Sequence, residues 1–160
     1  MKLYYLNEST SEYLPAGRKE LHAACLAAAR LRAKRPSISS ASAFIEHCQL
    51  IMASAPVESF YIFFVDSANK IIGREYKLSE GLENQTAVYP RKIMMEAIKR
   101  NATGIFLAHN HPSGSATPSR EDCVMTRAVS SAADILEIRL LDHIIVAGEG
   151  YFSFRENGYL

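Results

Sequence analysis

The chain has 160 residues, of which 48% are apolar and 22% are charged, and its formal net charge is +1 at pH 7. This balance is typical of a folded globular domain; it excludes a disordered chain and gives no reason to expect nucleic acid as a partner. The three cysteines lie far apart without a Cys-x-x-Cys pair, so neither a disulfide framework nor a thiolate zinc site is expected. No apolar signal core opens the chain, and no run approaches the roughly 20 apolar residues of a membrane span. We therefore expect a cytoplasmic protein that has no membrane partner.

Residues 1–55 are predicted to form a helical N-terminal extension. Residues 1–16 show no hydrophobic period, which predicts an irregular arm. Apolar side chains at helical spacing then predict helices over 17–34 and 41–53. Because an apolar face on these helices can pack on its own domain or on a second chain, the oligomeric state stays open.

A basic cluster ends the first predicted helix, and it consists of Arg30, Arg32, Lys34 and Arg35. One interpretation is a phosphate-binding patch, which would make nucleic acid a partner. The other is that these cations simply occupy the C-terminal end of a helix, where the helix dipole favours positive charge. The second interpretation is preferred.

Residues 56–160 are predicted to form the main domain. Aromatic and β-branched runs separated by turn residues predict strands over 60–65, 71–78, 103–108, 138–147 and 151–154. Helical spacing predicts helices over 91–100, where Pro90 marks the start, and over 119–133, where Ser119 is a natural N-cap. This order predicts an α/β protein of the α+β type, in which helices flank a mixed β-sheet.

The stretch from Leu107 to Asp122 carries the residues best suited to chemistry. His109 and His111 stand two residues apart at the exit of a predicted buried strand, so their rings share one face and can hold a metal. Asp122, brought back by the loop, would be a third ligand and would leave one position for water, which is the arrangement of catalytic zinc. Each residue also has a local interpretation, because loop histidines are common and Ser119-x-x-Asp122 resembles a helix capping box. The combination predicts a Zn²⁺ site that makes water acidic enough to react near neutral pH.

This combination also resembles a known family. His109-Asn-His-Pro112, Ser119 and Asp122 match the zinc motif of the JAB, or JAMM (MPN-plus), metalloprotease family. The longer run to Gly114 and the segments 117–119 and 140–146 are similar to its RadC branch, and the resemblance extends from about residue 56 to the C-terminus. It implies a JAB/MPN-like mixed sheet with cytidine-deaminase-like layering, and one Zn²⁺ per chain held by the two histidines and the aspartate.

The resemblance further assigns two catalytic residues. Ser119 falls on the serine that helps to stabilise the developing oxyanion, and Glu58 matches the glutamate that serves as general acid and base. Without the resemblance, Glu58 would be read as a solvated carboxylate at a strand edge. Glu96 and Glu121 are its rivals for the catalytic role.

The function predicted from these residues is that of a zinc-dependent metallopeptidase or isopeptidase, which cleaves amide bonds of a peptide or protein substrate through zinc-activated water. The alternative is a nucleic-acid-associated accessory protein of the DNA-repair (RadC) type, in which the metal is structural or serves phosphodiester chemistry. Residues 1–55 hold no glycine hairpin like the DNA-binding segment of longer RadC proteins, and the loop 114–117 departs from the usual family pattern.

For Asp142 and His143 we expect a buried Asp-His hydrogen bond that braces the sheet or the surroundings of the metal ligands.

Overall fold

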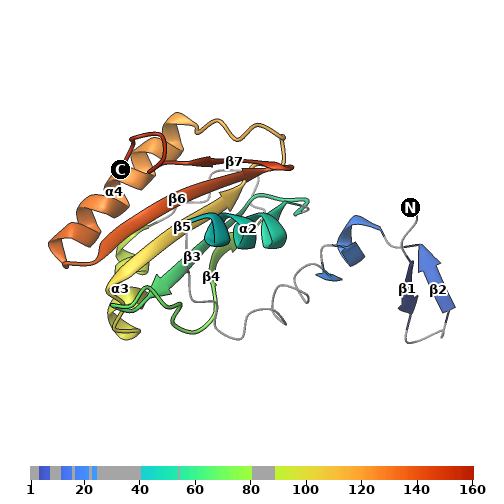
Figure 1. Cartoon of the computed structure of the whole chain (residues 1–160), viewed down its shortest axis with the longest axis horizontal. Coiled ribbons are helices and arrows are strands. Elements are labelled where there is room, and N and C mark those ends of the chain that lie inside the picture. The colour runs from blue at the N-terminus through green and yellow to red at the C-terminus, as the bar shows by residue number, and fades with distance from the viewer. Residues whose placement is uncertain are drawn as a thin grey trace.

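The apolar runs of the sequence assemble into a mixed five-stranded sheet (Figure 1). The computed structural model describes residues 4–7, 12–15, 17–21, 23–24, 41–53, 55–80 and 89–160. The strands lie in the order β4-β3-β5-β6-β7. They are β3 (Ser59–Val65), β4 (Tyr76–Glu80), β5 (Gly104–Asn110), β6 (Arg139–Ala147) and β7 (Gly150–Ser153). Only β5 and β6 run parallel, so the predicted α+β class with a mixed sheet is confirmed.

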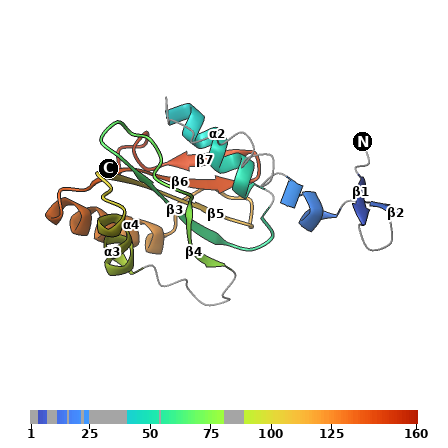
Figure 2. The same ribbon diagram turned by 90° about the horizontal axis from the view of Figure 1, so that it is seen from below.

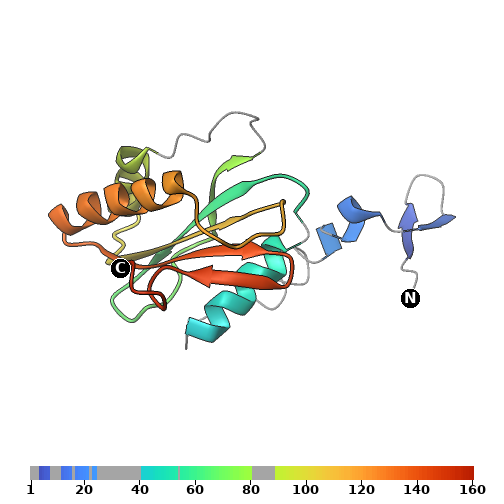
Figure 3. The same ribbon diagram turned by 90° about the horizontal axis from the view of Figure 1, so that it is seen from above.

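Helices cover both faces of this sheet (Figures 2 and 3). Helix α2 (Ala41–Met52) lies on one face, while α3 (Pro90–Lys99) and α4 (Arg120–Ile135) lie on the other. α4 forms the crossover that the parallel pair β5 and β6 requires. Within the described ranges, none of the helices is both long and apolar enough to cross a bilayer.

Burial on both faces explains why the two central strands are apolar almost throughout. All seven residues of β3 and all seven of β5 are buried, as expected for strands that lie between two helical layers. Alternate side chains enter opposite layers: Phe63 and Phe106 pack toward α2, whereas Ile62 and Leu107 pack toward α3 and α4. The odd-numbered positions of β5 therefore point to the side of α4, and this parity sets the direction of His109.

Two predicted elements differ from the structure. The irregular arm predicted for residues 1–16 is wrong, because β1 (Tyr4–Asn7) and β2 (Glu12–Pro15) pair as an antiparallel hairpin. Each segment is too short to show a hydrophobic period by itself. The strand predicted from residue 71 begins only at Tyr76, since Gly73 takes a positive φ of 75° and bends the chain there.

The first predicted helix is only partly covered by the structure. Residues 18–21 and 23–24 are helical, as predicted. The remainder of this helix and the whole basic cluster from Arg30 to Arg35 lie outside the described residues.

Helix α2 belongs to the predicted N-terminal extension, yet it packs closely on the sheet of the main domain. A mutation in α2 therefore tests the domain boundary predicted at residue 56. The ring of Phe44 is 2% exposed and lies 5.0 Å from the ring of Phe63 and 4.2 Å from that of Phe106. We expect Phe44→Ala to lower the free energy of unfolding by about 3–5 kcal/mol, because it leaves a cavity against the sheet. Urea unfolding measures this loss. The exposed neighbour provides the control, since Glu46→Ala should change stability by less than about 0.5 kcal/mol, and a similarly small effect of Phe44→Ala would support a boundary after α2.

Candidate metal centre

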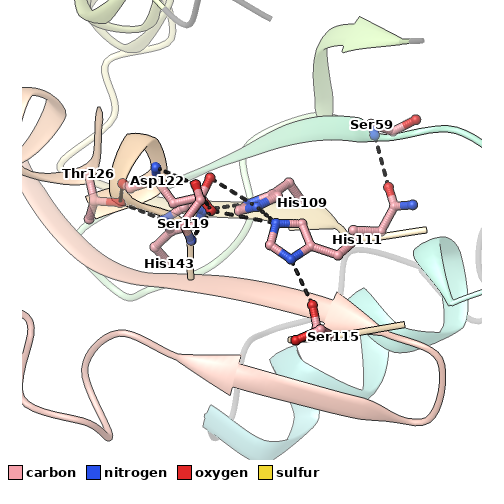
Figure 4. Close-up of polar contacts among 9 residues, drawn as sticks. Ser59, His109, His111, Ser115, Ser119, Asp122, Thr126 and His143 are labelled. Atoms are coloured by element: carbon pink, nitrogen blue, oxygen red, sulfur yellow. Dashed lines mark hydrogen bonds and ion pairs between the residues drawn. The ribbon is translucent and has the colours of Figure 1, made fainter. Parts of the chain in front are cut away.

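The two histidines of the His-x-His motif reach the same face of the sheet at the end of β5 (Figure 4). His109 is fully buried, and its ring stacks on that of Phe60 at 5.5 Å with an interplanar angle of 13°. The main-chain N–H of His111 donates to the carbonyl of Val146 at 2.8 Å, which continues the pairing with β6 beyond the strand. Nδ1 of His111 lies 2.8 Å from the carbonyl oxygen of Ser115. A carbonyl only accepts, so this nitrogen carries the proton and Nε2 presents a lone pair to the site.

Asp122 reaches the same point from the start of α4. The Ser119 side chain accepts from the main-chain N–H of Asp122 at 3.0 Å, and the Asp122 carboxylate accepts from the main-chain N–H of Ser119 at 2.8 Å. The predicted capping box is therefore confirmed. The same carboxylate faces both rings, with Oδ1 3.3 Å from Nε2 of His109 and Oδ2 3.5 Å from Nε2 of His111. The Asp122 carboxylate can thus cap the helix and face both histidines at the same time.

The spacing of these three groups fits a metal ion. Their ligand atoms all lie within 4.8 Å of one another, and the two Nε2 atoms are 2.9 Å apart. A tetrahedral ion with bonds of about 2.0–2.1 Å separates its ligand atoms by roughly 3.3–3.4 Å, close to these distances. Lone pairs that converge in this way repel each other unless a proton or a cation lies between them. The group His109, His111 and Asp122 can therefore hold a metal.

The electrostatics of the group favour a cation. Burial alone would raise the pKa of Asp122, but its close contacts with His109 and His111 and the hydrogen bond from Ser119 hold that pKa well below its usual range. The carboxylate is therefore ionised. The pKa of His111 is raised chiefly by the Asp122 carboxylate beside its Nε2, against the effect of burial. Burial above all lowers the pKa of His143 well below its usual value, so the His143 ring is neutral.

His143 lies directly behind the first ligand. Its Nε2 is 2.8 Å from Nδ1 of His109, and its Nδ1 is 2.7 Å from Oγ1 of Thr126. The expected Asp-His hydrogen bond is present, but it runs from the main-chain N–H of His143 to the carboxylate of Asp142 at 2.7 Å. Asp142 also accepts from Ser153 Oγ at 2.6 Å, so it braces the β6–β7 hairpin while the ring of His143 supports the metal ligand.

Glu58 lies one residue before β3, near the histidines. The register of β3 and β5 ends with Phe60 opposite His109; Glu58 precedes Phe60 by two residues, and His111 follows His109 by two. From strand alternation continued one residue beyond β3, we infer that the Glu58 side chain points to the side of Phe60 and His109. Glu58 is exposed, and its charge contributes to the raised pKa of His111. The rival Glu96 is engaged elsewhere, in an ion pair with Arg100 at 2.9 Å.

Asn110, the middle residue of the motif, holds the main chain on both sides of Glu58. Its Oδ1 accepts from the main-chain N–H of Ser59 at 2.9 Å, and its Nδ2 donates to the carbonyl of Val57 at 3.1 Å. Asn110 is only 3% exposed. The sequence alone predicts no role for Asn110, because its partners lie 51 and 53 positions away along the chain. Asn110 thus connects the strand that carries His109 to the segment that carries Glu58.

Comparison with known proteins agrees with this arrangement. Residues 38–159 match the sequence model of the RadC-like JAB domain. The chain belongs to the RadC-like JAB domain family. The resemblance predicted from the zinc motif is therefore confirmed.

The RadC-like JAB domain is similar to several uncharacterised bacterial proteins. It is 41% identical over 124 residues to a UPF0758 protein of Janthinobacterium sp. (strain Marseille), an alignment that covers 78% of this chain and 55% of that protein. It is 43% identical over 123 residues to a UPF0758 protein of Cupriavidus pinatubonensis, covering 77% and 54%. The corresponding protein of Methylibium petroleiphilum is 41% identical over 150 residues, covering 91% and 67%. The chain spans about half the length of the first two relatives.

The connection through Asn110 leads to a prediction for this RadC-like JAB domain. Asn110→Ala removes both side-chain hydrogen bonds and leaves the main chain at Ser59 without its buried acceptor. We expect the free energy of unfolding to fall by about 1–3 kcal/mol, and the Ser59 amide to lose protection in hydrogen exchange. Asn157 donates its side-chain amide to Ser153 at 2.8 Å, so Asn157→Ala is a matched control that should leave the Ser59 amide protected. Full protection of Ser59 in the Asn110 variant would contradict the proposed connection.

Proposed function

We propose that this RadC-like JAB domain is a zinc-dependent metallopeptidase or isopeptidase. The observation that supports the proposal is the convergence of His109, His111 and Asp122 within 4.8 Å. Structural zinc sites are closed by four protein ligands, whereas catalytic sites use three and keep one position open. Within the part of the chain that the structure describes, the group contains three candidate ligands, all of them nitrogen or oxygen donors. This donor set suits zinc and the catalytic arrangement.

The chain's own residues would divide the work of amide hydrolysis. A zinc ion held by this group would supply an acidified water and a Lewis acid for the substrate carbonyl. Glu58, whose charge acts on His111, would accept the proton of the attacking water and return it to the leaving amine. In this structure the Ser119 hydroxyl donates to Oδ2 of Asp122 at 2.6 Å. To stabilise the oxyanion, that hydroxyl must turn from the carboxylate to the substrate oxygen.

Metal content tests the ligand set. Elemental analysis of the purified protein should find about one zinc per chain, as a three-ligand site implies. Separate His109→Ala and Asp122→Ala variants should lose that zinc, because two remaining ligands hold the ion too weakly. Glu121→Ala removes the neighbouring exposed carboxylate and should leave the metal content unchanged. Equal zinc in all four proteins would overturn the assignment.

The role of Glu58 is tested by separating turnover from metal binding. The zinc-loaded protein is incubated with a library of peptides and isopeptide-linked peptides in water enriched in ¹⁸O, and mass spectrometry detects new carboxyl groups that carry the label. Glu58→Gln should retain the zinc and lower the cleavage rate by about 10²- to 10⁴-fold, the usual contribution of a general base. Glu121→Gln is the control and should cleave like the unaltered protein. Unchanged cleavage by Glu58→Gln would assign the proton transfer to another group.

The nucleic-acid alternative gains no support from the described residues. It depends on the basic cluster from Arg30 to Arg35, which lies outside them. The cytoplasmic location and the peptide or protein substrate stay predictions, and the oligomeric state stays open.

A further inference from the structure

Behind the candidate metal centre, a buried series of hydrogen bonds connects one ligand to another (Figure 4). Nδ1 of His109 lies 2.8 Å from Nε2 of His143, and Nδ1 of His143 lies 2.7 Å from Oγ1 of Thr126. Oγ1 of Thr126 in turn lies 2.6 Å from the carbonyl oxygen of Asp122, one helical turn earlier on α4. The two rings are fully buried and Thr126 is 1% exposed. Water is therefore excluded from these three bonds.

Counting protons along the series fixes its direction. A neutral imidazole has one N–H and one lone pair, and a hydroxyl has a single proton to donate. The Asp122 carbonyl only accepts, so the Thr126 hydroxyl donates to it and accepts from Nδ1–H of His143. Nε2 of His143 is then a lone pair that accepts from Nδ1–H of His109. This leaves Nε2 of His109 unprotonated at the point where the ligand atoms meet.

Packing prevents the His143 ring from leaving this arrangement. The ring of Phe154 stacks on it at 4.6 Å with an interplanar angle of 18°, and the ring of Phe60 lies 5.6 Å away on a second side. Thr126 sits in the regular part of α4, where a threonine hydroxyl readily donates to the carbonyl four residues earlier. His143, which contacts His109, and Thr126, which contacts His143, are therefore both held by the fold itself.

We propose that His143 and Thr126 are positioning residues that fix the tautomer of His109, so that its Nε2 lone pair faces the metal. The inference rests on the proposed metal centre. Histidine ligands usually donate their second N–H to a carboxylate, a carbonyl or a water, and His111 does so through the Ser115 carbonyl. Neutral His143 can accept the hydrogen bond from Nδ1–H of His109 at its Nε2 only if its own proton is on Nδ1. Thr126 keeps the proton there, because its hydroxyl oxygen accepts from Nδ1–H of His143. Unlike a carboxylate partner, His143 adds no negative charge behind His109, so a metal held there would be more electrophilic.

Matched threonine variants test this role. Thr126→Val removes the hydroxyl with little change of shape, whereas Thr126→Ser keeps it. Thr103→Val makes the same chemical change at the opposite end of β5, at a buried hydroxyl that has no hydrogen-bond partner among the residues the structure describes. Zinc and Co²⁺ affinities are measured by competition with a chelator. We expect Thr126→Val to lose about 10- to 100-fold in affinity, while Thr126→Ser and Thr103→Val stay within about threefold of the unaltered protein.

Imidazole ¹⁵N NMR reads the tautomer without any metal or activity. Long-range ¹H–¹⁵N correlation in the metal-free protein should show the His143 proton on Nδ1, and Thr126→Val should shift part of the population to Nε2. A proton on Nε2 of His143 in the unaltered protein would overturn the inference, as would full metal affinity in Thr126→Val. If the unaltered protein bound no zinc or Co²⁺, the proposed function would fail, and the NMR result would still decide the tautomer. Thermal unfolding of all variants separates loss of affinity from loss of folding.

Discussion

The structure around the site depends on one electrostatic constraint, the convergence of two imidazole lone pairs and a carboxylate within 4.8 Å. Such a convergence is stable only with positive charge at its centre. Each ligand is held from the outside by a different part of the fold. His109 stands in a strand that is buried on both faces, His111 is tied to the loop carbonyl of Ser115, and Asp122 is fixed by the capping box at the start of α4. The fold thus restrains all three side chains, which lowers the cost of binding an ion between them.

The register of the sheet extends this constraint to the proposed chemistry. β3 pairs with β5 up to Phe60 and His109, and Asn110 holds the chain on both sides of Glu58 just beyond that pair. The His-x-His motif therefore performs two tasks from adjacent residues. The histidines point to the layer of α4, while the residue between them points to the opposite layer and fastens the neighbouring strand.

Much of the domain was predictable from the sequence because the deciding signals are local. The continuous apolar run at 60–65 marks a strand buried on both faces, and the spacing of His109 and His111 marks two side chains on one face. Ser119 and Asp122 form a capping box within four residues, and this pattern predicts the start of α4. These short-range patterns gave the mixed sheet and the three candidate ligands.

The remainder could not be predicted because its partners are brought together only by the order of the strands. His109 and His143 are 34 residues apart in the chain, and they meet because β5 and β6 are parallel neighbours. Thr126 meets His143 across 17 residues, where α4 crosses the sheet. Nothing in the local sequence marks this threonine except its place one helical turn after Asp122. The hairpin of β1 and β2 escaped prediction for a similar reason, since neither four-residue strand has a pattern of its own.

The central claim is that the three converging ligands hold a zinc ion within reach of Glu58. An anomalous difference map from crystals, measured just above the zinc absorption edge, tests it most directly. One peak per chain is expected between Nε2 of His109, Nε2 of His111 and the Asp122 carboxylate, with the Glu58 side chain directed toward the open side of the ion. A map with no peak at this point, or with zinc bound at other residues, would contradict it.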